Sequence, residues 1–193
     1  MLDVRVGDAP YRELFAHTNY RHPRVGRLCP RGRAQRRHAR QRRGDPVAAA
    51  SFDAIVLTEV LEHVPDPPAV LVDLALRPSG RLFLTVPSCG RCMSLPHDYF
   101  RYTDAGLRAL LERAGFESVK IQASSDSFTT VAALLRNIGS VTGRDPSDGR
   151  DAAREKAAEI LAELADHVEA LGPLDVDRAL PLGFAASATR SAA

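Results

Sequence analysis

The 193-residue chain lacks several features that define whole classes of protein. It has no tryptophan, only three cysteines, and no apolar run near the roughly 18 residues that a membrane span requires. A basic segment followed by the apolar core of a signal peptide is also absent. Because three thiols are an odd number, we do not expect a disulfide framework. These absences argue against a membrane span and a secreted disulfide scaffold, so we expect a cytoplasmic protein with reduced cysteines.

Acidic residues are missing from one stretch of the chain. The totals are nearly balanced, with 26 Lys and Arg against 24 Asp and Glu, yet residues 21–43 contain ten arginines and no acid. This stretch has neither a helical nor a strand period, so we expect residues 21–45 to be an irregular segment rather than a native strand. No aromatic side chain interleaves the arginines for stacking on bases, so we do not expect a nucleic-acid partner.

From residue 51 onward the chain alternates between strand and helix patterns. Residues 52–57 and 81–86 are largely apolar at consecutive positions, as expected for strands covered on both faces. Between them, Asp66 and Pro67 are typical first residues of a helix, and residues 77–80 predict a turn. The alternation predicts an α/β fold with a Rossmann-like, mostly parallel sheet flanked by helices.

The pattern continues toward the C-terminus. Thr103 predicts the start of a helix that Gly115 ends. Further expected elements are strands over residues 1–4, 116–122 and 182–189, a helix over 9–15, and an amphipathic helix over 157–171. We expect one domain over residues 1–193, incomplete on its N-terminal side.

Two groups of motifs resemble class I S-adenosylmethionine-dependent methyltransferases. Residues 52–64, Phe-Asp-Ala-Ile-Val-Leu-Thr-Glu-Val-Leu-Glu-His-Val, and residues 76–82 are similar to the fourth and fifth strands of that family. Residues 96–103, Pro-His-Asp-Tyr-Phe-Arg-Tyr-Thr, with Ala-Gly-Phe at 114–116, resemble its type 11 branch. The resemblance implies methyl transfer from S-adenosylmethionine to an oxygen or nitrogen atom of a small molecule.

The front of the chain is similar to a degraded form of the family's first motif, an acid on a strand followed by Gly-x-Gly. Arg5 stands where the first glycine is expected, and we expect its side chain to intrude on the methionine end of the pocket. The acid that would hold the ribose has no counterpart in residues 21–44. The alternative to an active enzyme is therefore a non-catalytic methyltransferase-like remnant with an impaired cofactor site. The cofactor-binding residues that the resemblance implies are Asp3, Gly7, Asp8, Asp45, Thr58 and Glu59.

Three side chains after the strand over residues 52–57 are candidate metal ligands. If this segment takes a helical turn, Glu59, Glu62 and His63 face the same way. Two carboxylates and an imidazole could hold Mg²⁺, and the pattern resembles the magnesium ligands of ubiquinone-pathway O-methyltransferases and small-RNA 2′-O-methyltransferases. The alternative is that these side chains line the cofactor pocket without a metal.

The loop over residues 97–102 carries the candidate catalytic residues His97, Tyr99 and Arg101. The resemblance places this loop beside the methyl acceptor. His97 could take a proton from a hydroxyl group, and Arg101 could hold a carboxylate or phosphate. The alternative is structural, with the aromatic rings packed on the sheet and Asp98 paired with Arg101.

Overall fold

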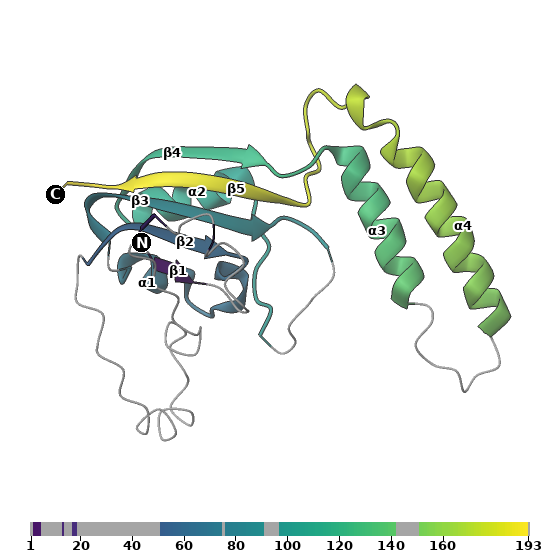
Figure 1. Cartoon of the computed structure of the whole chain (residues 1–193), viewed down its shortest axis with the longest axis horizontal. Helices are drawn as coiled ribbons and strands as arrows, with labels where there is room; N and C mark the ends of the chain where they lie inside the picture. The colour runs from purple at the N-terminus through teal and green to yellow at the C-terminus, as the bar shows by residue number, and fades with distance from the viewer. Residues whose placement is uncertain are drawn as a thin grey trace, which may run out of the picture. The chain divides into compact units, whose positions relative to one another are not determined.

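The computed structural model describes residues 2–4, 13, 17, 18, 51–74, 76–90, 97–141 and 151–192. In chain order its elements are β1 (Leu2–Val4), β2 (Phe52–Thr58), the 3-10 helix η4 (Leu61–His63), α1 (Pro67–Val72), β3 (Leu76–Pro87), α2 (Asp104–Arg113), β4 (Phe116–Ala123), α3 (Ser127–Val141), α4 (Asp151–Glu169), the 3-10 helix η6 (Gly172–Leu174) and β5 (Gly183–Arg190) (Figure 1). The predictions for Arg5, Gly7 and residues 21–45 lie outside the described residues, and only Glu13 is described within the expected helix over 9–15.

Five strands form one sheet in the order β1-β2-β3-β5-β4. β1 pairs with β2, and β2 with β3, in parallel. Figure 1 shows β4 running in the same direction, whereas β5 runs the opposite way between β3 and β4 toward the C-terminus. The prediction of a mostly parallel, Rossmann-like sheet is therefore confirmed, including the common direction of the strands at residues 53, 81 and 116.

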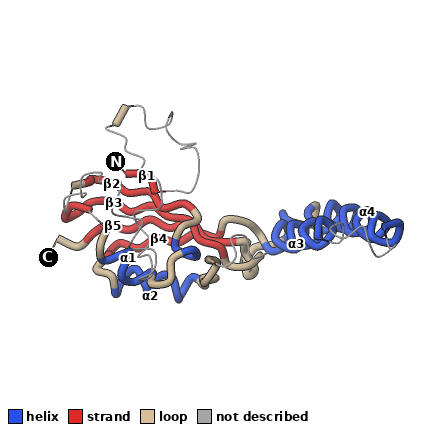
Figure 2. Tube along the Cα trace, turned by 90° about the horizontal axis from the view of Figure 1, so that it is seen from below, coloured by secondary structure: helices blue, strands red, loops and turns tan. Residues whose placement is uncertain are grey.

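Helices α1 and α2 begin where the sequence predicts. The Asp66 carboxylate accepts a hydrogen bond from the amide of Ala69 at 3.1 Å, and the Thr103 hydroxyl accepts one from Gly106 at 3.1 Å. Each cap satisfies an amide that has no partner within its own helix. Both helices lie on the same side of the sheet (Figure 2), and their fully buried residues are Leu71, Leu107 and Leu111.

Residues 77–80, predicted as a turn, belong to β3 instead. The β2–β3 pairing passes from Phe52 opposite Leu76 to Ala54 opposite Arg81, so two steps along β2 correspond to five along β3. The extra residues bulge from the ladder, and Ser79 has a positive φ of 60°. These residues therefore interrupt the regular pairing, as turn residues do, but they lie inside a strand that continues on both sides of them.

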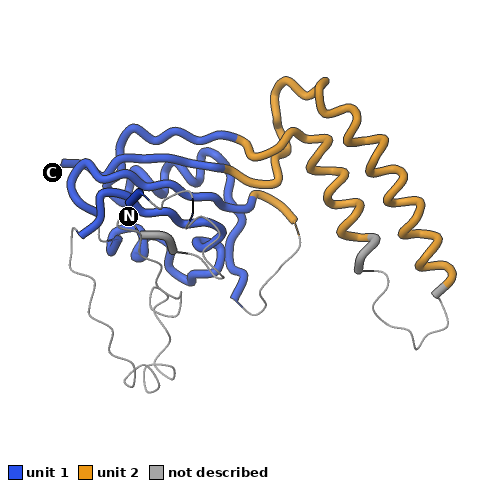
Figure 3. The backbone as a smooth tube through the Cα atoms, viewed as in Figure 1, with its two compact units in different colours: residues 1–87, 93–122, 185–193 blue, residues 88–92, 123–184 orange. Residues whose placement is uncertain are grey.

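The chain divides into two compact units (Figure 3), unit 1 over residues 1–87, 93–122 and 185–193, and unit 2 over residues 88–92 and 123–184. Unit 1 contains most of the sheet. In unit 2, α3 packs against α4, where Ala132 and Ala165 are fully buried. Ile160 and Leu164, which the periodicity places on the buried stripe of α4, are about half exposed. None of the helices in these ranges is long and apolar enough to cross a bilayer.

Candidate functional site

Polar residues gather where the parallel strands of unit 1 end. β2 ends at Thr58, which lies opposite Thr85 of β3. Parallel strands share one carboxyl edge, and ligands of open α/β sheets bind outside that edge. The residues that follow β2 and β3 are therefore the candidates for ligand contact.

Glu59 leaves β2 in a conformation that side chains rarely adopt. Its φ is 51°, in the left-handed region, and its side chain is exposed. β3 holds this residue twice, because the Glu59 amide donates to the Thr85 carbonyl at 3.2 Å and the Glu59 carboxylate accepts from the Thr85 hydroxyl at 2.7 Å. Backbone strain of this kind clusters at functional sites, where the surroundings enforce it.

Glu62 has a buried carboxyl group, and only one of its two oxygen atoms lies near a polar partner within the part of the chain that the structure describes. The residue is 3% exposed, and its Oε1 lies 3.5 Å from His63 Nε2. Among the described residues, Oε2 has no hydrogen-bond partner. Burial raises the pKa of the Glu62 carboxyl to about 7, and the charges of Glu59 and Asp98 push it the same way. A backbone hydrogen bond and His63 oppose this rise.

Tyr102 fixes the end of the 97–102 loop to the strand ends. Its amide donates to the carbonyl of Pro87, the last residue of β3, at 2.9 Å. Its hydroxyl donates to the Leu61 carbonyl in η4 at 3.0 Å, and the ring is buried. Burial, together with the charge of Glu62, raises the pKa of this phenol. No local sequence pattern predicts this contact, because its partners lie 41 residues apart.

His97 and Tyr99 form a polar pair on the same loop. His97 Nδ1 and the Tyr99 hydroxyl are 3.0 Å apart. Two contacts with η4 hold the pair in place. The Tyr99 amide donates to the Glu62 carbonyl at 2.7 Å, and His63 Nδ1 lies 2.7 Å from the His97 carbonyl. His97 and Tyr99 remain exposed, so the loop presents both side chains to solvent.

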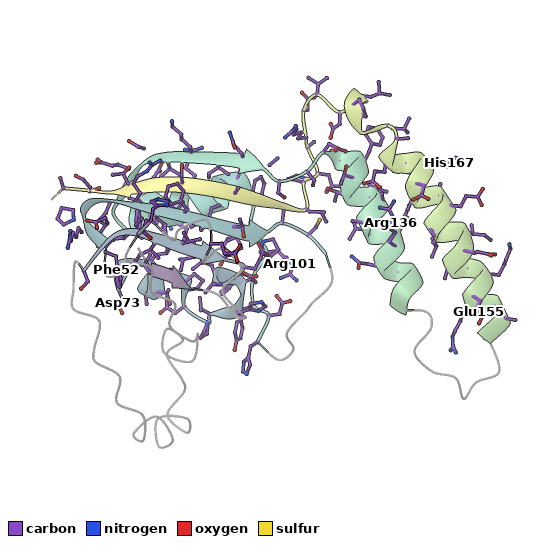
Figure 4. All side chains as sticks on the ribbon, viewed as in Figure 1. Phe52, Asp73, Arg101, Arg136, Glu155 and His167 are labelled. Carbon is purple, nitrogen blue, oxygen red and sulfur yellow. The ribbon has the colours of Figure 1, made fainter. Side chains whose placement is uncertain are left out.

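Arg101 is paired within the loop. Its guanidinium donates to both carboxylate oxygens of Asp98, at 2.5 and 2.9 Å, and to the Phe100 carbonyl at 2.8 Å. The Asp98 side chain is only 1% exposed. Figure 4 places Arg101 at the end of the sheet toward which β2 and β3 run. The predicted Asp98–Arg101 pairing is thus present, whereas the rings of Tyr99 and Phe100 are exposed rather than packed on the sheet.

The remaining predicted residues are divided between this edge and undescribed parts of the chain. Asp3 lies on β1 opposite Val56, so the end of β1 meets the same edge as Thr58. Gly7, Asp8 and Asp45 lie outside the described residues. The Thr58 side chain is buried.

The geometry does not support the candidate magnesium site. Within the described ranges, no three His, Cys, Asp or Glu side chains form a group that could hold a metal ion. The Glu59 carboxylate accepts a hydrogen bond from the Thr85 hydroxyl, and Glu62 Oε1 lies 3.5 Å from His63 Nε2.

Comparison with known proteins identifies relatives by sequence. A family model described as "Methyltransferase domain" matches residues 12–121. Over 39 residues, 19% of this chain, the sequence is 54% identical to a ubiquinone biosynthesis O-methyltransferase of Xanthomonas axonopodis pv. citri. That match covers only 16% of the curated relative.

Solved structures share the fold at low identity. A SAM-dependent methyltransferase from Archaeoglobus fulgidus has a TM-score of 0.52 and 15% identity, with 98% of this chain and 85% of that one covered. The [4+2]-cyclase SpnF has a TM-score of 0.53 and 16% identity, with coverages of 100% and 75%. A phosphoethanolamine N-methyltransferase 2 from Haemonchus contortus, in complex with phosphomonomethylethanolamine and S-adenosylhomocysteine, has a TM-score of 0.51 and 14% identity. The alignment covers 99% of this chain, which spans about half of the Haemonchus protein, 48% of its length.

Proposed function

The chain belongs to the class I S-adenosylmethionine-dependent methyltransferases, and we propose that it transfers a methyl group to an oxygen or nitrogen atom of a small molecule. The observation that carries the proposal is the polar carboxyl edge of unit 1. There, a strained acid after β2 lies on the same edge as an exposed His–Tyr pair after β3. This arrangement offers one group of residues for a cationic cofactor and another for an acceptor.

Glu59 and Thr58 form the described part of the proposed cofactor side. Glu59 presents an exposed carboxylate that Thr85 holds in place, which suits the positively charged amino and sulfonium groups of S-adenosylmethionine. When bound, this cofactor supplies a methyl group already activated on sulfur. By family resemblance, we assign the remaining contacts to Asp3, Gly7, Asp8 and Asp45.

His97 and Tyr99 form the proposed acceptor side. An imidazole accepts protons near neutral pH, so His97 can take the proton that an attacking hydroxyl or amino group loses. Tyr99 bonds the Nδ1 atom of His97, which leaves Nε2 for that proton. Arg101 is already bonded to Asp98, so we assign it to shaping the loop rather than to binding an acidic acceptor.

Binding of S-adenosylhomocysteine, measured by isothermal titration calorimetry, tests the cofactor side. We expect binding by the wild type and an affinity about tenfold weaker for Glu59→Gln, because a charge-assisted hydrogen bond is lost. Glu155→Gln, at an exposed position on α4, is the matched control and should bind like the wild type. Absence of binding by both the wild type and Arg5→Gly would favour the non-catalytic remnant, whereas tighter binding by Arg5→Gly alone would identify Arg5 as the obstacle.

Transfer of a labelled methyl group to a panel of small phenols and amines tests the acceptor side. We expect His97→Ala to lower the rate constant by about 10²-fold while leaving S-adenosylhomocysteine binding unchanged. Equal turnover by His97→Ala and the wild type would remove His97 from the reaction.

A further inference from the structure

Three contacts join η4 to the acceptor-side loop in antiparallel order. They pair the Leu61 carbonyl with the Tyr102 hydroxyl, the Glu62 carbonyl with the Tyr99 amide, and the His63 ring with the His97 carbonyl. On the η4 side, the first two contacts use main-chain carbonyls, which any residue would supply. His63 is thus the η4 residue that reaches the loop in this series through its side chain.

The His63 contact fixes which ring nitrogen carries a proton. A carbonyl oxygen can only accept a hydrogen bond, so His63 Nδ1, 2.7 Å from the His97 carbonyl, must be the donor. His63 Nε2 then faces Glu62 Oε1 at 3.5 Å. Because Glu62 is buried, the ring is confined between a main-chain carbonyl on one side and a fixed carboxyl group on the other.

This confinement acts on the proposed acceptor-side pair. The residue whose carbonyl His63 holds is His97, and the His97 ring bonds the Tyr99 hydroxyl at 3.0 Å. Tyr99 is itself held through its amide by the Glu62 carbonyl. Both members of the pair are therefore anchored on consecutive residues of η4.

We propose that His63 is a positioning residue for the acceptor site, which holds the main chain at His97 so that the His97–Tyr99 pair keeps one orientation. The inference rests on the proposed function, because this orientation matters for catalysis only where the pair faces an acceptor. It also gives the Glu-x-x-Glu-His pattern a role that requires no metal ion. Glu62 and His63 hold a loop, and Glu59 belongs to the cofactor side.

The test is NMR spectroscopy of the full-length protein labelled with ¹⁵N, using long-range correlations within the histidine rings. We expect His63 in the wild type to carry its proton on Nδ1. We expect neutral His97 to carry its proton on Nδ1, where it donates to the Tyr99 hydroxyl, because this tautomer leaves Nε2 able to accept a proton from the methyl acceptor. In His63→Ala, the His97 ring should lose this single tautomer, and the Tyr99 amide should exchange about tenfold faster as its neighbouring contact is lost.

Two further variants separate positioning from general stability. In His63→Asn the amide nitrogen stands the same number of bonds from the main chain as Nδ1, so this variant should restore the His97 tautomer and slow exchange at Tyr99. His167→Ala, at an exposed position on α4, should leave both signals unchanged. If His63→Ala does not fold, the wild-type tautomer and the His63→Asn spectrum still decide the question.

A proton on Nε2 alone in neutral wild-type His63 would overturn the proposal, as would unchanged His97 signals in folded His63→Ala. An unrestored His97 tautomer in folded His63→Asn would also count against it. Titration of the same samples with S-adenosylhomocysteine tests the proposed function separately. The expected tautomers without binding would refute the cofactor site while leaving the anchoring of the loop in place, and binding without these tautomers would do the reverse.

Discussion

Two arginine–carboxylate clusters, one in each unit, have the same chemistry in different surroundings. Arg101 in unit 1 bonds both oxygens of Asp98, whose side chain is 1% exposed. Arg136 in unit 2 bonds Asp166 at 2.7 Å and Glu169 at 2.6 Å, linking α3 to α4, but these acids are 73% and 43% exposed. Figure 4 labels both arginines. Distance alone does not rank these pairs, because water reaches both acids of the second cluster but not the Asp98 side chain of the first.

The same contrast extends to the rest of each unit. The carboxyl edge of unit 1 has buried polar groups. The side chains of Glu62 and Asp98 are both buried there, and the charge of Asp98 contributes to the raised pKa of Glu62. In α3 and α4, by contrast, the fully buried residues among those whose burial the structure describes are Ala132, Ala165 and Thr130. Unit 1 therefore maintains a costly polar edge, which is typical of a functional site, whereas the helix pair follows ordinary packing.

The largest expected effect comes from removing the buried cluster's cation. Arg101→Ala leaves the Asp98 carboxylate buried without its guanidinium partner, so we expect the free energy of unfolding to fall by about 3–5 kcal/mol. Urea titration followed by circular dichroism measures this change. A loss below about 1 kcal/mol would mean that the Asp98 site is as well solvated as the exposed cluster and would erase the contrast between the units.

Glu62→Gln should give the next largest effect, with a distinctive pH dependence. The folded-state pKa of about 7 lies above the unfolded value near 4.5, so the folded chain keeps a proton that the unfolded chain releases. The free energy of unfolding of the wild type should therefore fall as pH rises from about 4.5 to 7, by up to about 3 kcal/mol. Glutamine cannot ionise, so the variant should match the wild type near pH 4 and exceed it in stability at pH 8. Parallel stability curves for the two proteins would show that Glu62 ionises freely.

One helix cap from each unit, Thr103 in unit 1 and Asp126 in unit 2, extends the comparison to smaller effects. Thr103→Ala removes an uncharged cap from α2 in unit 1 and should cost about 1 kcal/mol at every pH, with Thr103→Ser as the matched control. Asp126 caps α3 in unit 2, where hydrogen bonds from the amide and hydroxyl of Thr129 lower its pKa. Its contribution is present above the unfolded pKa and is lost as pH falls through the lower folded value. Asp126→Asn should therefore reduce the fall in the free energy of unfolding at acid pH, whereas Thr103→Ala should leave that pH dependence unchanged.

Arg136→Ala should have the smallest effect. The cluster that links α3 to α4 is exposed to solvent and screened by salt, so its removal should leave the urea midpoint nearly unchanged. Any small loss should disappear in roughly 0.5–1 M NaCl, where the Debye length falls to a few Å. A loss as large as that of Arg101→Ala would refute the ranking by burial.

The elements that the sequence predicted well are those with local signals. Asp66 and Thr103 mark helix starts through their own side chains, and the apolar runs of β2 and β3 need no partner to be recognised. Helix α3 was not predicted, because residues 127–131 include Phe, Val and two Thr, all weak helix formers. Its packing against α4 supplies stability that no local pattern contains.

The site residues could likewise be predicted where the signal was local, and their contacts could not where the partners are distant in the chain. The polar residues after β2 and β3 could be identified because parallel strands end at one edge. Their partners could not, because the contact of Thr85 with Glu59 and that of Tyr102 with Leu61 connect residues far apart in the chain. The burial of Glu62 likewise depends on the loop that covers η4, which a helical periodicity of Glu59, Glu62 and His63 does not reveal.

The most direct test of the central claim is a titration of the ¹⁵N-labelled protein with S-adenosylhomocysteine, followed by amide chemical shifts in both units. We expect saturable shifts at Thr58 and Glu59, smaller ones over residues 60–63 and 97–102, and unchanged amides along α4. Saturable shifts confined to α3 and α4, or no shifts at millimolar ligand, would contradict a cofactor site at the carboxyl edge of β2 and β3.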